Sequence, residues 1–237
     1  MPHAGWAYSG RLAFKTLRML NNDCDVVAVI GGHMMAGSGV VAAFEDEIET
    51  PLGSLVVAKD LLESLKRQIQ VEPDKRPDNT VEIQLPMIKY LFPEATTIWL
   101  RVGAGEESMD LGRSLAGAAA ESGVKICVAG STDLTHYGPD YGFTPAGYGG
   151  DSYEWARKVN DAGIIQKMVE MNPRAVLEWG NVKKAACSAG AAAAAIEYAE
   201  AMGCEEGVLT GYENSCDLNP GNSFVGYAGI LYSKRES

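Results

Sequence analysis

Histidine is scarce in this sequence: its 237 residues include only three, His3, His33 and His136. Each lies in a motif rich in Gly, Ser or Thr, namely PHAGWAYSG, IGGHMMAGSG and GSTDLTHYG. Histidine is the usual side chain for metal ligation and for proton transfer near neutral pH. Because all three border predicted strand ends, we expect them to form one site.

Basic residues are also few. Lys and Arg number 20 against 31 Asp and Glu, and the net charge of -11 argues against binding to nucleic acid or to an anionic membrane surface. The longest weakly polar stretch, AACSAGAAAAAIEYAEAMG, is interrupted by Glu197 and Glu200. It therefore predicts a tightly packed helix and no membrane span.

The sequence has no CxxC spacing and no visible secretory signal. Its five cysteines are an odd number, which predicts no disulfide framework. The first residues, MPHAGW, lack the positively charged and apolar segments of a signal peptide. We therefore expect a cytoplasmic protein in a reducing compartment.

No linker or shift in composition divides the chain, and its 46% hydrophobic residues suffice for one core, so we expect a single domain over residues 1–237. Short apolar runs alternate with segments of helical period, which predicts an α/β fold with helices covering a sheet. The predicted strands are 25–32, 53–58, 96–103, 125–133, 206–214 and 222–233. The predicted helices are 9–20, 59–68, 80–92, 109–121, 151–171, 172–179 and 187–202.

Two of these strands, 25–32 and 125–133, run into polar loops that contain His33 and His136. Ligands bind such sheets beyond the carboxyl ends of the strands, so we expect the two histidines to converge there. The irregular segment 138–151 is expected to wall or cover the site.

Asp133 precedes His136 by three residues. A carboxylate that accepts a hydrogen bond from one imidazole nitrogen raises the basicity of the other, so this pair suits a general base. Alternatively, Asp133 caps a short helix and His136 lies on the surface. His3 has two similar interpretations: it acts as a ligand in the site, or it has only a structural role.

Cys187 stands at the predicted start of a helix, where the helix dipole favours the thiolate and therefore metal binding or redox chemistry. The alternative is a small buried residue in an Ala-rich helix. In the segment RPDNTVEIQLP, Asp78 and Glu82 suit carboxylates that orient the histidines, or Thr80 and Glu82 simply begin a helix.

The sequence closely resembles the Memo family, whose bacterial and archaeal members are called AmmeMemoRadiSam system protein B. Seven stretches carry the resemblance, in order, between residues 2 and 229: PHAGWAYSG, the loop containing Gly31-Gly32-His33, ETPLGSL, DNTVEIQLP, GSTDLTHYG, Cys187 before the Ala-rich helix, and SFVGYAGI. The resemblance implies a fold like that of class III extradiol dioxygenases, with a central mixed sheet flanked by helices and non-haem iron in a pocket.

The resemblance also implies a site. The metal ligands of Memo-like proteins map to His3, His33 and Cys187, and a further active-site histidine maps to His136, with Asp133 beside it. Ring-cleaving relatives have a carboxylate as the third ligand. A thiolate is softer and widens the choice of metal to iron, copper or zinc.

The sequence departs from the family pattern near the expected pocket. Many members have Glu-His-Ser where Asp78-Asn79-Thr80 stands here, so an imidazole is replaced by the amide of Asn79, which does not titrate. Many also have Cys-Gly where this chain has Cys187-Ser188. We expect Asp78, Asn79 and Glu82 to surround the metal ligands without binding the metal.

Two hypotheses about function follow. The first is a redox or oxygenase-type protein that uses iron or copper on a small molecule, with His136 and Asp133 moving protons. The second is a metal-handling or partner-binding module without catalysis, for which the family's genomic association implies a radical SAM protein and an AMMECR1-like protein as partners. Zinc-dependent hydrolysis is a third alternative.

Overall fold

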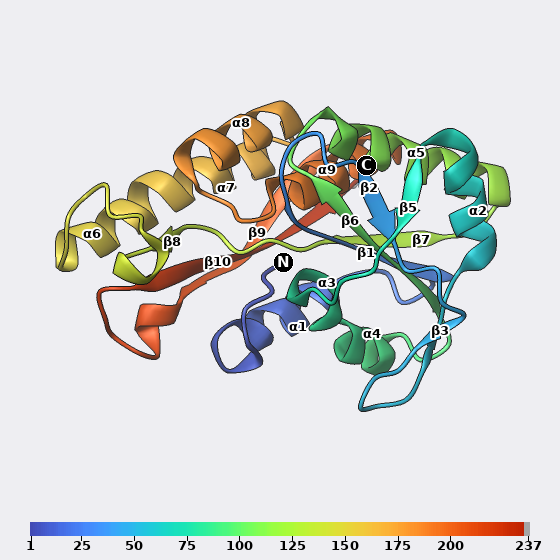
Figure 1. Ribbon diagram of the computed structural model, residues 1–237, viewed down its shortest axis with the longest axis horizontal. Helices are drawn as coiled ribbons and strands as arrows, with labels where there is room; N and C mark the ends of the chain where they lie inside the picture. The colour runs from blue at the N-terminus through green and yellow to red at the C-terminus, as the bar shows by residue number, and fades with distance from the viewer. Residues whose placement is uncertain (235–237) are drawn as a thin grey trace.

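The computed structural model describes residues 1–234 and has a mixed sheet at its centre (Figure 1). The strand order in this five-stranded sheet is β5-β2-β6-β1-β7. Strand β1 pairs in parallel with β6 and β7, whereas β2 runs antiparallel to β6. The bounds are β1 Val26–Met34, β2 Val40–Ala42, β5 Val71–Pro73, β6 Thr96–Gly103 and β7 Ile126–Gly130. The predicted α/β class is thereby confirmed.

Strand β1 is apolar on both faces because helices cover both. Val26, Ala28 and Ile30 pack into one core with side chains of α2, α5 and α9, whereas Val27 and Val29 pack on the other side with those of α3 and α4. Figure 1 shows these helices above and below the sheet. A strand buried on both faces reads as a continuous apolar run, which is why the sequence predicted it.

The described helices are α1 Arg11–Leu17, α2 Lys59–Gln68, α3 Asn79–Glu82, α4 Leu85–Leu91, α5 Glu106–Ser122, α6 Gly150–Trp155, α7 Ala162–Val169, α8 Pro173–Lys183 and α9 Ala189–Ala201. Two π-helical turns, η1 Trp6–Gly10 and η3 Ala156–Asp161, precede α1 and α7. Helix α8 begins at the predicted Asn172-Pro173, where the Asn172 side chain accepts a hydrogen bond from the Ala175 N–H. None of the helices among residues 1–234 has the length and apolar character that crossing a membrane requires.

A second sheet, with strand order β8-β10-β9, is antiparallel. Its strands are β8 His136–Tyr137, β9 Glu206–Asn214 and β10 Phe224–Ser233. Ala192, Ile196 and Ala228 share a core with Ile164 and Met168, so the Ala-rich helix α9 packs between the two sheets. Small side chains allow this helix to approach α5 closely, since a Cβ added at Gly112 would meet the Ala194 carbonyl oxygen.

Several predicted elements differ from the structure. The predicted strand 53–58 is reduced to β4 (Leu55–Val56), which pairs with β3 (Glu47–Ile48). A turn occupies residues 50–53, and Val57 forms an isolated bridge to Thr97. The predicted helix 80–92 is divided into α3 and α4, and Pro86, which has no N–H, lies in the first turn of α4.

Candidate metal centre

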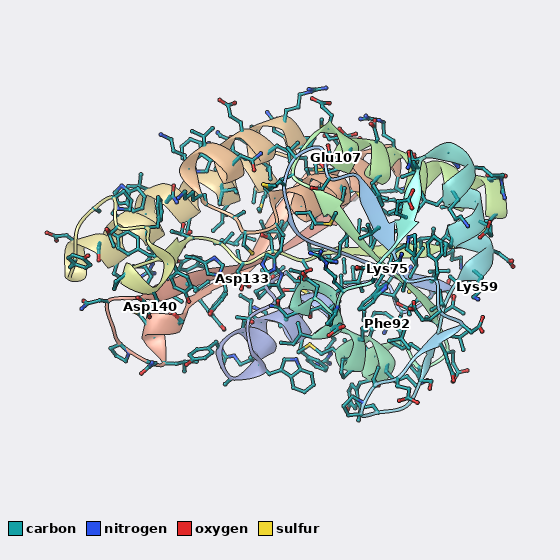
Figure 2. All side chains as sticks on the ribbon, in the orientation of Figure 1. Lys59, Lys75, Phe92, Glu107, Asp133 and Asp140 are labelled. Atoms are coloured by element: carbon teal, nitrogen blue, oxygen red, sulfur yellow. The ribbon has the colours of Figure 1, made fainter. Side chains whose placement is uncertain are left out.

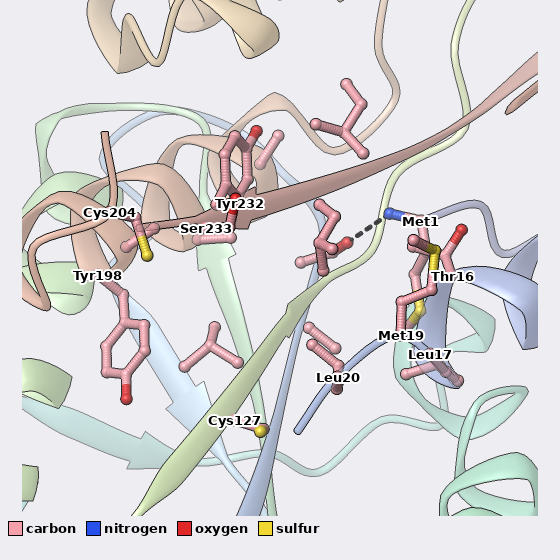
Figure 3. A pocket seen from close by; sticks show the side chains of 18 of the residues that line it. Met1, Thr16, Leu17, Met19, Leu20, Cys127, Tyr198, Cys204, Tyr232 and Ser233 are labelled. Atoms are coloured by element: carbon pink, nitrogen blue, oxygen red, sulfur yellow. Dashed lines mark hydrogen bonds between the residues drawn. The ribbon is translucent and has the colours of Figure 1, made fainter. Parts of the chain in front are cut away.

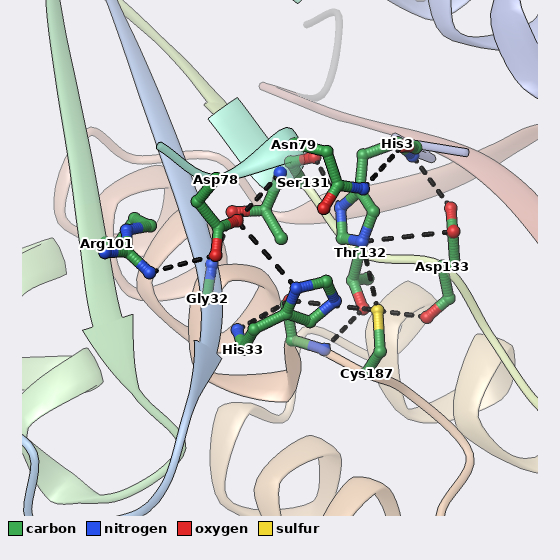
Figure 4. A network of polar contacts seen from close by, with 12 residues as sticks. His3, Gly32, His33, Asp78, Asn79, Arg101, Ser131, Thr132, Asp133 and Cys187 are labelled. Carbon is green, nitrogen blue, oxygen red and sulfur yellow. Dashed lines mark hydrogen bonds and ion pairs between the residues drawn. The ribbon is translucent and has the colours of Figure 1, made fainter. Parts of the chain in front are cut away.

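The structure brings together His3, His33 and Cys187, whose ligand atoms all lie within 4.8 Å of one another. His33 lies near the carboxyl end of β1, His3 precedes η1, and Cys187 lies between α8 and α9 (Figure 4). The three therefore meet at the sheet edge where ligands bind in this class of fold. Two imidazoles and a thiol form a donor set that suits iron, copper or zinc.

His3 is buried, with 1% of its surface exposed. Its Nδ1 atom lies 2.9 Å from Ser131 Oγ, and its Nε2 atom lies 3.1 Å from Cys187 Sγ. Burial, followed by the nearby His33, holds the pKa of His3 well below its usual value. The ring is therefore neutral at pH 7, and the bond to Ser131 leaves Nε2 as the nitrogen that faces the other ligands.

His33 has a backbone φ of 58°, a left-handed conformation that is uncommon outside glycine. The pairing of β1 with β6 shifts register between Gly31 and Met34, and the His33 N–H donates to Ser188 Oγ at 3.2 Å. A Cβ added at Gly32 would lie 2.7 Å from Ser188 Cβ, so this glycine permits the close approach. The irregular strand end thus turns His33 toward Cys187.

Asp78 stands behind His33, with its Oδ1 atom 3.8 Å from His33 Nδ1. Its carboxylate also accepts hydrogen bonds from Arg101 at 2.9 Å and from the Thr80 N–H at 2.9 Å. Asp78 therefore both caps α3 and lies beside an expected metal ligand. The sequence analysis placed the start of this helix at Thr80 and Glu82, whereas the structure makes Asp78 its N-cap.

Cys187 is half-buried, and its N–H donates to the Asp133 carbonyl oxygen at 3.2 Å. Burial, and then the charge of Asp133, raise the pKa of the thiol to about 12. This differs from the thiolate expected at a helix start, because α9 begins only at Ala189 and burial outweighs the dipole. The thiol stays protonated at pH 7 unless a bound metal displaces its proton.

Asp133 does not orient His136 by direct contact in the way that the sequence spacing suggested. Its carboxylate accepts a hydrogen bond from the His3 N–H at 2.7 Å and lies 3.9 Å from His3 Nε2. Among residues 1–234 no hydrogen bond or ion pair joins it to His136. The reason is that residues 131–135 form no helical turn, so the spacing of three residues does not bring the two side chains together.

His136 is half-buried in β8, and its ring packs edge-on against Tyr141 with a centroid separation of 4.9 Å. Burial, and then the neighbouring His33, lower the pKa of His136 to about 4. Its imidazole is therefore neutral at pH 7, the form that accepts a proton. Tyr141 comes from the predicted irregular segment 138–151, which does contribute a wall beside this histidine.

Asn79 is exposed, and its Nδ2 atom donates to the His3 carbonyl oxygen at 3.2 Å. Glu82 is also exposed, and within the described part of the chain it makes no hydrogen bond or ion pair with a histidine. The placement of Glu82 around the ligands therefore differs from expectation, because on the short helix α3 it faces solvent.

Sequence reasoning missed Ser131, Asp74 and Arg101. Arg101 is buried in β6, where it donates two hydrogen bonds to Asp74, both at 2.6 Å, as well as one to Asp78. A lone cation within the apolar run TTIWLRVG was the available signal, since a buried charge requires a partner. Ser131 carried no comparable signal.

A cavity of about 470 Å³ lies beside β7 and β10, and its wall includes Met1, Cys127 and Tyr198 (Figure 3). None of the three expected ligands lines it, but Thr132 does, and its Oγ1 atom lies 3.8 Å from Cys187 Sγ. Figure 2 places Asp133, the neighbour of Thr132, near the middle of the molecule. The cavity is therefore adjacent to the candidate metal centre and separate from it.

The fold is similar to that in the crystal structure of the uncharacterized protein JW3007 from Escherichia coli K12, with a TM-score of 0.51 and 16% sequence identity over 91% of each chain. The MEMO1 family protein of Thermococcus onnurineus is 28% identical, covering 99% of this chain and 86% of its own. The MEMO1 family protein of Pyrococcus horikoshii is 30% identical, covering 98% and 85%. The family model described as Memo-like protein matches residues 1–231, and the chain belongs to that family.

Proposed function

We propose that this protein is a metal-dependent redox or oxygenase-type protein of the cytoplasm that acts on a small molecule. His3, His33 and Cys187 would hold iron or copper, and zinc is the third metal that suits this donor set. The observation that carries the proposal is the meeting of three ligand atoms within 4.8 Å beside a neutral, half-buried His136.

The residues around the ligands supply the rest of the site. Ser131 hydrogen-bonds to Nδ1 of His3, and the Asp78 carboxylate lies 3.8 Å from Nδ1 of His33, which favours one ring orientation for each. A bound iron or copper ion would supply electron transfer and an open coordination position for substrate. His136 would accept or deliver a proton at its free ring nitrogen, and Tyr141 would limit the access of water to that ring.

Metal analysis of protein purified without chelator tests the ligand assignment. We expect stoichiometric iron or copper in the wild type and its loss in Cys187→Ala. Oxygen uptake with catechols and a panel of small phenols tests the chemistry, and His136→Gln should abolish uptake while leaving the metal content intact. Purified protein that contains no iron, copper or zinc would contradict the proposal. Hydrolysis that persists without oxygen would favour the zinc alternative.

A second candidate function is a metal-handling or partner-binding module that does not catalyse a reaction. Asn79 favours this second candidate. Its amide donates a hydrogen bond to the His3 carbonyl oxygen and adds no titrating group to the pocket. The partners would be a radical SAM protein and an AMMECR1-like protein. Metal-loaded protein that binds either partner and consumes no oxygen with any phenol would support this candidate over the first.

A further inference from the structure

Arg101 is a buried cation to which the proposed function assigns no role. It lies in β6 opposite Gly31 of β1, the last regular pair before the register shift that leads to His33. Only 9% of its side chain is exposed. Nε and one terminal nitrogen donate to the two oxygens of Asp74, both at 2.6 Å, and the other terminal nitrogen donates to Asp78 Oδ2 at 2.9 Å. One guanidinium therefore holds two carboxylates.

The two carboxylates lie at the ends of the connection between β5 and α3. Asp74 directly follows the last residue of β5, and Asp78 is the N-cap of α3. The planar fork of a guanidinium bonds to both at once, whereas the single ammonium group of a lysine cannot make the same set of bonds. Arg101 thus attaches both ends of this connection to the central sheet. We call residues 74–80, which include the first residues of α3, the β5–α3 segment.

The β5–α3 segment holds His33 and the residue before it. Asp78 Oδ1 lies 3.8 Å from His33 Nδ1 (Figure 4). Two residues further along the segment, Thr80 Oγ1 accepts a hydrogen bond from the Gly32 N–H at 3.1 Å. Gly31 permits this approach, since an added Cβ would collide with Thr80 Oγ1. The segment therefore constrains both the irregular end of β1 and the ring of His33.

The same segment also holds His3. Asn79 lies between the two residues that constrain His33, and its Nδ2 atom donates to the His3 carbonyl oxygen at 3.2 Å. His3 is outside regular secondary structure, so side chains take the place of a strand partner, and the Asp133 carboxylate accepts its N–H. Three consecutive residues of the segment thus contact the surroundings of both imidazole ligands.

A buried ion pair is in itself weak evidence for stability, because apolar side chains of similar volume often serve equally well. Arg101 differs from a purely structural cation in that its partner Asp78 is also the neighbour of His33. Residues that orient metal ligands in this way influence metal affinity without touching the metal.

We propose that Arg101 is a positioning residue for the two histidine ligands. By holding Asp74 and Asp78 together, its guanidinium fixes the β5–α3 segment, which in turn fixes His33 and His3. This proposal rests on the proposed function only in taking both histidines as metal ligands, and it applies to iron, copper and zinc alike.

A double variant, Arg101→Met with Asp74→Leu, tests the proposal. It removes one positive and one negative charge, so the net charge beside His33 stays the same. The apolar replacements should preserve the fold, while Asp78 and the β5–α3 segment lose their anchor. We expect the affinity for zinc or cobalt to fall about 10–100-fold, as when a residue that orients a ligand is lost. Titration of metal-free protein in a competitive chelator assay measures the change.

Amide hydrogen exchange of the metal-free protein gives a second readout, which does not depend on metal. The Gly32 N–H should exchange about tenfold faster in the double variant, the ratio expected when one hydrogen bond is lost. In nitrogen-15 NMR the ring signals of His3 and His33 should move, and those of His136 should not. The signals that disappear in His136→Gln identify the third histidine.

Two variants serve as controls. Arg113 also bonds to two carboxylates, Asp110 at 2.7 Å and Glu197 at 3.0 Å, where α5 packs on α9. Arg113→Met therefore removes the same group from a similar arrangement at another place in the fold. Asp161→Asn removes the charge of another buried carboxylate, in η3. Both controls should keep the wild-type metal affinity and the wild-type exchange of Gly32.

Wild-type metal affinity in the double variant would overturn the proposal, and so would an equal loss of affinity in the two controls. If the wild type itself binds no metal, the proposed function fails. The metal-free readouts then decide, and unchanged Gly32 exchange with unchanged ring signals would overturn the positioning role.

If the double variant does not fold, Arg101→Lys takes its place. This variant keeps the charge and loses the planar fork. The metal affinity should fall and the exchange of Gly32 should accelerate, each at least about twofold, the lower end of what one hydrogen bond contributes. Unchanged values of both in Arg101→Lys would overturn the proposal.

Discussion

His3 Nε2 lies 3.1 Å from Cys187 Sγ, although 184 positions separate the two residues in the chain. Both are held by residues of the segment after β7: Ser131 bonds to the His3 ring, and the Asp133 carbonyl oxygen accepts the Cys187 N–H. The segment that follows one strand thus places two ligands from opposite ends of the sequence. These two ligand atoms are therefore already close enough to bind one metal ion.

Replacing Cys187 by alanine removes the thiol from this pair. We expect the affinity for zinc or cobalt to fall by more than about 100-fold, since the loss of even an outer-shell partner costs 10–100-fold. Titration of metal-free protein in a competitive chelator assay measures the change, and the thiolate charge-transfer band of the cobalt form should vanish. Cys204→Ala is the matched control, because that thiol is half-buried elsewhere. Equal affinities in all three proteins would show that Cys187 is not a ligand.

Asp78 and Asp74 share Arg101 as a partner, but only Asp78 lies beside His33. Breaking either buried pair should lower the free energy of unfolding by about 3–5 kcal/mol. Asp78→Asn should in addition weaken metal binding about 10–100-fold, because it removes the carboxylate behind His33 Nδ1. Urea unfolding and metal titration of both variants measure the two effects. A similar metal affinity in Asp74→Asn and Asp78→Asn would contradict a special role for Asp78.

The central sheet was predictable because burial on both faces leaves a continuous apolar pattern, as in Val26, Val27, Ala28, Val29 and Ile30. Strands β2 and β5 were not predicted, since each has only three residues and depends on pairing with a neighbour. The division of the predicted helix 80–92 was signalled by Pro86. The place of the division depended on tertiary contacts, including the Gln84 side chain, which donates to the Pro2 carbonyl oxygen.

The site was predictable only in part. The family motifs pointed to His3, His33 and Cys187, which the structure brings together. The partner of Asp133 was not predictable, because residues 133 and 136 lie on one side only if the segment forms a helical turn, and in the structure it does not. The partners of Arg101 were not predictable either, because Asp74 and Asp78 precede it by 27 and 23 residues. Only the strand order β5-β2-β6 shows that they meet.

The stability of the protein should depend on pH through Asp161. Burial raises the pKa of this carboxyl to about 6, whereas an unfolded chain has a value of about 3.9. Between these values the folded state binds more protons, so the free energy of unfolding decreases as the pH rises from about 4 to about 6. At about 1.4 kcal/mol per pKa unit, the loss is on the order of 3 kcal/mol.

Urea unfolding of the wild type and Asp161→Asn between pH 4.5 and 7.5 measures this contribution, because other titrating groups cancel in the difference. The wild type should lose stability relative to the variant as the pH rises and show a plateau above the folded-state pKa. Asp140→Asn, whose carboxylate is exposed, serves as the control and should show no such trend. A constant difference between the wild type and Asp161→Asn would contradict a perturbed Asp161.

Asn79 offers a test of whether the pocket can be given stronger acid-base chemistry. Its amide already contacts the His3 backbone, so Asn79→His places an imidazole beside a metal ligand at a cost of about 1 kcal/mol for the lost hydrogen bond. If the protein is an oxygenase-type enzyme, oxygen uptake with small phenols should rise by about 100-fold, the lower end of what a positioned acid or base supplies. Asn79→Gln should show no gain, since an amide does not titrate. Uptake that stays at the wild-type level in metal-loaded Asn79→His, with unchanged metal content, would instead favour the module without catalysis.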